Sequence, residues 1–257
     1  MRAAVQRLLP QGPVDLLRQI VLFCGAYSLY RLVRGEVYGE SALAYVHADS
    51  IVRLERSLHV FVEPAIQRWA IGTGFLNGLT SWMYINLHFV VTTVTLAFIY
   101  VRRNEHFYFL RNMYMVAMGL ALVGYVVYPT APPRLFPELG FTDSVAQFTH
   151  VSDTSSFSTL FNPYAAVPSM HVCFALMIGL SMARIARRAW ARRLWAVYPT
   201  VMTFVVVSTA NHWVLDAVAG ALVAAVSAVA AVLFARARPQ AWAWAPQRAL
   251  ATPVRAG

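Results

Sequence analysis

Long apolar stretches alternate with short polar connections along most of this chain of 257 residues. A helix crosses a bilayer core with about 20 consecutive apolar residues, and most of the stretches approach that length. The pattern predicts an all-α integral membrane protein, a bundle of six transmembrane helices that forms a single domain over residues 1–257. The expected spans are Leu16–Val33, Trp82–Val101, Met113–Tyr128, Val167–Ala183, Leu194–Trp213 and Leu215–Ala235.

The boundary between the last two spans lies near Asp216, where one apolar stretch runs into the next. We expect a tight turn near Val214 and Leu215 to separate them. The first stretch is expected to be a retained span rather than a cleaved signal peptide, since the remaining bundle needs this helix.

The connection between the first two spans carries a helical pattern of its own. Apolar residues recur there every three or four positions, while Arg53, Arg56, Glu63 and Arg68 lie off the stripe. We expect an amphipathic helix in the membrane interface, kinked at Pro64. It either helps to admit a lipid head group or simply packs across the bundle. The stripe consists of Ile51, Leu54, Leu58, Val62, Ile66 and Trp69.

The composition agrees with a membrane protein. Hydrophobic residues make up 59% of the chain and charged residues 12%, against about 45–50% and about 25% in an average soluble domain. These values exclude a disordered chain and an ordinary cytosolic enzyme. The net charge is +10, and every basic residue is Arg. Because the Arg residues form short clusters between apolar runs, we expect the lipid bilayer, and no nucleic acid, as partner.

The distribution of Arg predicts the orientation in the membrane. Fifteen Arg residues fall on the side that holds both termini, and six fall on the other. The positive-inside rule then places both termini in the cytoplasm. The connections Arg34–Ser81 and Pro129–Ala166 face outward, so any site they carry is extracytoplasmic. We expect this membrane to be the plasma membrane.

Polar and ionisable residues, which are expensive in membrane spans, gather in three patches at the outward end. The first runs from Pro129 to Arg134, just outside the third span. Its prolines end the helix and restrain Arg134, whose guanidinium is suited to gripping a phosphate in bidentate fashion. An interfacial Arg that reaches toward lipid head groups is the alternative.

The second patch, Pro168-Ser169-Met170-His171, begins the fourth span. Pro is suited to the first position of a helix, and the free amides of a helix start bind anions, so Ser169 is a candidate phosphate ligand. His171 lies one turn in, where it can hand a proton to a departing oxygen. A simple helix cap is the alternative.

The third patch closes the fifth span and contains Asn211, His212 and Asp216. His212 and Asp216 are four residues apart, so on one helix the carboxylate can hold the imidazole in one tautomer and raise its basicity. An imidazole held in this way is a competent nucleophile. Alternatively, the two residues only lock neighbouring spans together.

The three patches share one face, because consecutive spans alternate in direction. The end of the third span, the start of the fourth and the end of the fifth all lie outward. We therefore expect one site that contains Arg134, Ser169, His171, His212 and Asp216.

Over residues 128–220 the chain resembles the type 2 phosphatidic acid phosphatase superfamily. The resemblance rests on Ala-Pro-Pro-Arg ending at Arg134, Pro-Ser-Met-His ending at His171, and Asn-His-x3-Asp from Asn211 to Asp216. It implies metal-free phosphoryl transfer from a membrane lipid phosphate, with no cofactor. His212 would attack phosphorus to give a phosphohistidine, Asp216 would orient it, and His171 would protonate the leaving group. The implied substrate-binding residues are Arg134, Ser169 and Asn211.

The chain departs from the family pattern at several positions. Two of the three cationic phosphate ligands of the family are absent, and the surviving motifs look more like the branch that contains inositol phosphorylceramide synthase, which moves a head group between lipids. Arg53, Arg56 or His88 either replaces the lost charge or is structural. The departures are Val127 for Lys, Leu135 for Pro, Met170 for Gly, and Val205 and Val206 for a Ser-Arg pair.

Three readings of the function stay open at this point. A lipid-phosphate phosphatase and a phosphotransferase need the same residues, since only the acceptor differs. A proton-coupled transporter would use the two His and Asp216 as a relay, although such groups usually lie near the midplane of a repeated fold. Two His and one Asp also resemble a metal-ligand set, whereas Arg134 favours an anion.

Overall fold

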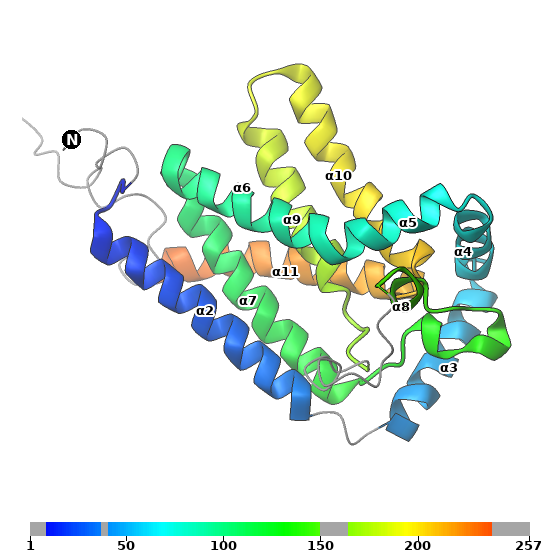
Figure 1. Ribbon diagram of the computed structural model, residues 1–257. Coiled ribbons are helices and arrows are strands. Elements are labelled where there is room, and N and C mark those ends of the chain that lie inside the picture. The colour runs from blue at the N-terminus through cyan, green and yellow to red at the C-terminus, as the bar shows by residue number, and fades with distance from the viewer. Residues whose placement is uncertain (1–8, 37–40, 150–163, 238–257) are drawn as a thin grey trace, which may run out of the picture.

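The computed structural model describes residues 9–36, 41–149 and 164–237, and these are helical apart from short links and one isolated β-bridge between Thr130 and Ala165. The first helices are α2 (Pro13–Glu36), α3 (Ser41–Ser57), α4 (Glu63–Gly72), α5 (Phe75–Trp82) and α6 (His88–Arg102). They are followed by α7 (Asn104–Val127), α8 (Ser144–Thr149), α9 (Met170–Ile185), α10 (Ala189–Ser208) and α11 (Val214–Ala237). Figure 1 shows their arrangement.

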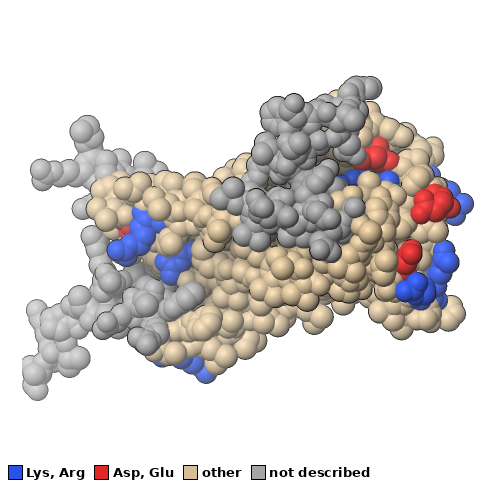
Figure 2. Space-filling view, turned by 90° about the horizontal axis from the view of Figure 1, so that it is seen from below, with Lys and Arg blue, Asp and Glu red and all other residues tan. Residues whose placement is uncertain are grey.

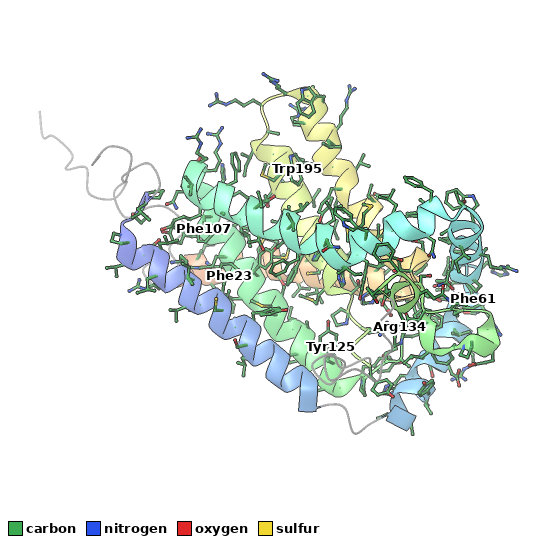
Figure 3. All side chains as sticks on the ribbon, viewed as in Figure 1. Phe23, Phe61, Phe107, Tyr125, Arg134 and Trp195 are labelled. Carbon is green, nitrogen blue, oxygen red and sulfur yellow. The ribbon has the colours of Figure 1, made fainter. Side chains whose placement is uncertain are left out.

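Helix α7 lies at the centre of the helices and contacts α2, α6, α9 and α11. Its buried side chains, such as Phe107, Tyr114 and Ala121, form one apolar cluster with Cys173 and Ile178 of α9. In Figure 3, Phe23 and Phe107 lie toward one end of the molecule, whereas Tyr125, Arg134 and Phe61 lie toward the other. The second end carries all three sequence patches.

Three helices in the described ranges are long and apolar enough to cross a membrane. They are Phe75–Arg102, which joins α5 and α6 through a π-helical turn at Met83–Leu87 (η2), together with α7 and α11. They are compatible with an integral membrane protein. The distribution of charge agrees with this, because on the face drawn in Figure 2 the charged residues of the described part lie toward the two ends of the molecule.

The other three expected spans correspond to α2, α9 and α10. Helix α9 is apolar but has only 16 residues, against the ~20 that a bilayer core requires. Helices α2 and α10 carry Arg residues near their ends. The bundle of six transmembrane helices therefore stays a prediction.

The amphipathic helix expected before the second span is two helices, so the predicted kink at Pro64 is wrong. Helix α3 ends at Ser57, and α4 begins at Glu63 with Pro64 in its first turn, a position that suits the fixed φ of proline. Between them the chain turns through His59, whose φ is 59°. The turn ends the regular spacing, so much of the expected apolar stripe is exposed while Glu63 is buried.

Helices α7 and α11 approach the segment before α9 closely, and a glycine makes each approach possible. A Cβ on Gly124 of α7 would lie 2.8 Å from Cδ of Pro168. A Cβ on Gly220 of α11 would overlap the carbonyl oxygen of Ser169. The start of α9 is thus held between two helices, and the hydroxyl of Tyr125 donates a hydrogen bond to the Pro168 carbonyl at 3.1 Å.

Gly220→Ala is expected to lower the free energy of unfolding by about 1–3 kcal/mol, because the added methyl group displaces the backbone at Ser169. Thermal unfolding of the purified protein in detergent measures the change. The matched control is Gly119→Ala on α7, where a Cβ meets nothing within 4 Å. Equal melting temperatures for Gly220→Ala and the wild type would contradict this packing.

Candidate active site

His212 lies in the link between α10 and α11, which spans Thr209–Trp213. The break expected near Val214 and Leu215 is therefore earlier in the chain. The amides of Asn211 and His212 both fold back to the carbonyl of Val206, at 3.0 and 3.2 Å. Ala210 has a φ of 53°, a left-handed conformation that an α-helix of L-residues does not continue.

The predicted pairing of His212 with Asp216 is made without a continuous helix. Nδ1 of His212 lies 3.2 Å from Oδ2 of Asp216, and the same oxygen accepts the amide of Trp213 at 2.9 Å. Asp216 is fully buried and His212 nearly so. A carboxylate at Nδ1 favours the tautomer with its proton there, which leaves the lone pair of Nε2 for chemistry.

His171 is the second residue of α9, and its ring lies 5.8 Å from that of His212 between centroids. On its other side, the ring of His171 contacts the continuous helix Phe75–Arg102. It stacks on the ring of Tyr84 at 4.6 Å and lies 4.8 Å from the ring of His88. Tyr84 belongs to the π-helical turn η2, a feature common at functional sites, and His88 follows it directly.

Ser169 is the N-cap of α9, so the prediction that Pro168 is the first helical residue is wrong. The backbone of Ser169 is extended, and its amide donates to the carbonyl of Asp216 at 3.0 Å. Its hydroxyl is buried and has no hydrogen-bond partner within the described ranges. The α9 start thus lies directly against the first turn of α11, with a polar atom to offer to a ligand.

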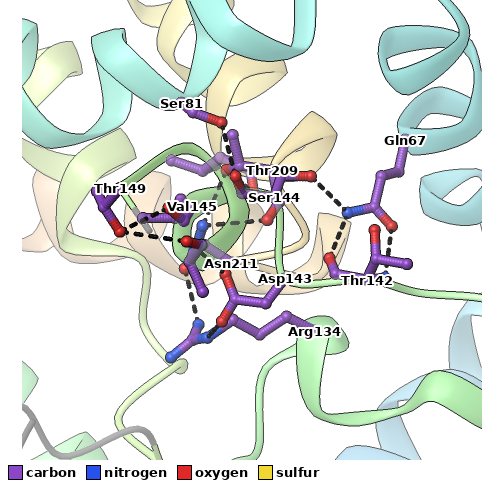
Figure 4. A network of polar contacts seen from close by, with 12 residues as sticks. Gln67, Ser81, Arg134, Thr142, Asp143, Ser144, Val145, Thr149, Thr209 and Asn211 are labelled. Carbon is purple, nitrogen blue, oxygen red and sulfur yellow. Dashed lines mark hydrogen bonds and ion pairs between the residues drawn. The ribbon is translucent and has the colours of Figure 1, made fainter. Parts of the chain in front are cut away.

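Arg134 lies in a short 3-10 helix, Pro133–Leu135 (η3), and is held by three groups. Nη1 donates to Oδ1 of Asn211 at 2.7 Å, and the backbone amide donates to the carbonyl of Ala210 at 2.8 Å. Nε lies 3.3 Å from Oδ2 of Asp143, an ion pair that the sequence did not predict (Figure 4). Arg134 and Asn211, two of the residues expected to bind substrate, are therefore bonded to each other.

The segment that carries Asp143 is anchored by Gln67 of α4. The Gln67 amide nitrogen donates to the Thr142 carbonyl at 2.7 Å and to the Ser144 hydroxyl at 3.1 Å, while its oxygen accepts the Thr142 amide at 3.2 Å (Figure 4). Oδ1 of Asp143 accepts the Ala146 amide at 2.8 Å and so caps α8. Asp143 is thereby fixed beside Arg134.

Trp213 follows His212 and is a fully buried side chain. Its indole nitrogen donates to the carbonyl of Ala131 at 2.9 Å, and the rings of Phe136 and Phe141 meet it edge-on at 5.6 and 5.7 Å. The segment around Arg134 and the link that carries His212 are therefore joined by one large side chain.

The structure thus brings all the predicted site residues to one end of the bundle, from three separate segments of the chain. A family model described as the PAP2 superfamily matches residues 49–230, which run from α3 into α11 and include all three segments. The chain belongs to the PAP2 superfamily. No curated protein and no solved structure matches it. Since members of the superfamily are phosphatases, membership supports an enzyme of the phosphatase or phosphotransferase type.

The structure of this PAP2 protein shows the surroundings of the positions that depart from the family pattern. Val205 and Val206, at the positions of the Ser-Arg pair, are buried in apolar clusters. Val127, at the position of the Lys, is exposed at the end of α7. Neither place offers a charge to the site of this PAP2 protein.

Two of the three candidates for the missing charge lie on the outer surface of α3. Arg53 is exposed and donates to the Ser50 hydroxyl at 2.8 Å, and exposed Arg56 lies over the ring of Phe61 at 5.0 Å. Within the described part of this PAP2 protein, only His88 among the three contacts a predicted catalytic residue.

The metal-site reading has no geometric support in the residues that the structure describes. There, no group of three or more His, Cys, Asp or Glu side chains is arranged to hold a metal ion. The His212 ring in this PAP2 protein instead lies beside a buried carboxylate and a second imidazole.

Proposed function

We propose that this chain is a metal-independent lipid-phosphate phosphatase or phosphotransferase that works through a covalent phosphohistidine on His212. The observation that carries the proposal is the arrangement around this residue. Asp216 occupies Nδ1, the ring of His171 lies beside it at 5.8 Å, and Arg134 is bonded to the neighbouring Asn211. The proposed nucleophile and proton donor are thus neighbours, and the proposed phosphate ligand is bonded to the residue before the nucleophile.

In the first step, Nε2 of His212 attacks phosphorus, and the bond between phosphorus and the ester oxygen breaks. His171, protonated, gives its proton to that oxygen, which leaves as an alcohol. In the second step, a water or an alcohol gives a proton to His171 and attacks the phosphohistidine, which frees His212. Arg134 and the hydroxyl of Ser169 stabilise the charge on the phosphoryl oxygens.

A head-group transferase like the inositol phosphorylceramide synthase branch is the second candidate. It is favoured by the apolar burial of Val205 and Val206, since a site with fewer cations is better suited to a phosphodiester than to a dianionic monoester. A proton-coupled transporter is a distant third. We further propose that six helices span the plasma membrane, with both termini cytoplasmic and the site extracytoplasmic.

The test is product analysis with purified protein in detergent micelles. Radiolabelled phosphatidic acid and phosphatidylinositol are supplied with and without an alcohol acceptor. Release of inorganic phosphate identifies a phosphatase, and transfer to the alcohol identifies a transferase. Label that stays on the protein and is lost in acid but not in base identifies a phosphohistidine. Proton-coupled uptake into proteoliposomes without any lipid product would overturn the proposal.

Asp143→Asn is expected to lower KM for the lipid phosphate about two- to fivefold, because a partly exposed carboxylate no longer competes for Arg134. The asparagine keeps the cap of α8 and Arg134 keeps its bond to Asn211, so kcat changes little. Initial rates against substrate concentration measure both constants. Glu138→Gln, at an exposed residue nearby, is the control. An unchanged or raised KM in Asp143→Asn would show that the ion pair aids binding.

A further inference from the structure

Two glutamates that take no part in the steps above lie at the start of α11. Glu55 comes from α3 and Glu63 from α4, and both are fully buried. Oε1 of Glu63 accepts the amide of Val214 at 2.8 Å, and Oε1 of Glu55 accepts the amide of Leu215 at 2.8 Å. These amides belong to the first turn of a helix, where they have no partner within the helix.

The two carboxyl groups lie side by side, because they bind two consecutive backbone amides. Their second oxygens, Oε2, are buried and have no hydrogen-bond partner in the described ranges. A hydrogen bond between two carboxyl groups needs a proton, and two buried carboxylates in contact would repel each other. One proton between the two Oε2 atoms would give each of them a partner and leave the pair with a single negative charge.

Burial raises the pKa of Glu55 to about 9, and the neighbouring carboxyl group of Glu63 acts in the same direction. The amide of Leu215 opposes the shift, while the charge of Asp216 adds a little to it.

The charged groups around the pair come from each neighbouring element. Asp216 of α11 is the acidic neighbour, and His212 in the adjoining link is bound to it. The Arg residues on the same two helices are exposed: Arg56 of α3 lies over Phe61, and Arg68 of α4 donates to the carbonyl of Pro64. In the described ranges, no cation forms an ion pair with Glu55 or Glu63.

Three consecutive backbone amides are thus each held by a carboxyl group. Trp213 is bound by Asp216, Val214 by Glu63 and Leu215 by Glu55. The first of these bonds uses the same Asp216 oxygen that holds His212. The position of that oxygen depends on the first turn of α11, which the glutamates fix from outside.

We propose that Glu55 and Glu63 are positioning residues, a carboxyl pair with one shared proton that fixes the first turn of α11 and so aims Asp216 at His212. The effect on catalysis rests on the proposed function. The shared proton does not, and it is tested separately below.

Glutamine replacements test the shared proton, because glutamine keeps the shape of glutamate. In either Glu55→Gln or Glu63→Gln, the new amide donates to the remaining carboxylate, and its oxygen still accepts the backbone amide. In the double variant both NH2 groups face each other, and neither finds an acceptor. We expect kcat for phosphatidic acid to stay within about threefold of the wild type in each single variant and to fall about 30-fold or more in the double variant.

KM is expected to stay nearly constant in the double variant, since Arg134 and Ser169 are untouched. A purely structural role of the two side chains does not give this pattern. It predicts either a double variant with wild-type kcat or a loss of kcat equal to the combined losses of the two single variants. Full activity in the double variant would overturn the positioning role. A strong loss in both single variants would overturn the shared proton.

Thermal unfolding against pH tests the pair without any activity. Folded protein keeps the Glu55 proton up to about pH 9, whereas the unfolded chain loses it near 4.5. The stability that this proton contributes is therefore complete below pH 4.5 and is lost as the pH rises toward 9. We expect the melting temperature to fall more steeply in this window for the wild type than for Glu55→Gln.

Asp49→Asn is the matched control, because it removes an exposed carboxylate from the same helix and should keep the wild-type slope. Parallel slopes for the wild type and Glu55→Gln would overturn the shared proton. If the wild type turned over no lipid at all, the proposed function would be wrong. The dependence of the melting temperature on pH would still show whether Glu55 and Glu63 share a proton.

Discussion

His212→Ala is expected to reduce turnover of a lipid phosphate by at least about 10³-fold, because the variant has no group that can form the covalent intermediate. Asp216 cannot take over, since its Oδ2 accepts the amide of Trp213 and its side chain is fully buried. The measurement is the initial rate of product release from phosphatidic acid, together with the amount of acid-labile label on the protein. Both should vanish together.

The control for this variant is His106→Ala, which removes an exposed imidazole at the start of α7. It should keep both turnover and label. Melting temperatures of the two variants show whether each is folded. Wild-type turnover in His212→Ala would exclude the phosphohistidine mechanism, and label that persists there would place the covalent intermediate on another residue.

His171→Ala is expected to lose about 10²- to 10⁴-fold in kcat on a lipid phosphate, whose alkoxide needs a proton in order to leave. The loss should be smaller by at least about tenfold on p-nitrophenyl phosphate, because its phenolate leaves without a proton. The physical reason is position: the ring of His171 lies beside that of His212 and against Tyr84 and His88, so no other described imidazole is equally placed.

The comparison of the two substrates is its own control, since His212→Ala should lose both to the same extent. An equal loss on both substrates in His171→Ala would mean that this residue positions the phosphate or the nucleophile instead of donating a proton. Retained activity on both would remove it from the mechanism.

The convergence of the candidate site residues at one end of the bundle was predictable because it depends on local signals. Apolar periodicity placed α7 and α11, and the alternation of helices brought Arg134, His171 and His212 to one end. The pairing of His212 with Asp216 depends only on a spacing of four residues, which the link between α10 and α11 preserves although no helix continues through it.

The residues that hold the site were not predictable, because their partners are distant in sequence. A rule that assigns charged residues to the surface places Glu55 and Glu63 in solvent, yet they bind amides more than 150 positions away. Asp143 likewise gives no local sign that it faces Arg134. The stripe from Ile51 to Trp69 failed for a related reason, since one turn at His59 separates its two halves.

The burial of Trp213 has a consequence for the kinetics. The indole of Trp213 is bonded to Ala131 and packed against Phe136 and Phe141. We therefore expect the adjoining His212, the proposed nucleophile, to be ordered when the chain folds, before any substrate binds. The conformational entropy of the His212 side chain is then lost once, when the chain folds, and is not lost again each time a ligand binds. In such a preformed site, the free energy of substrate binding is available to stabilise the transition state and is not used to order the site.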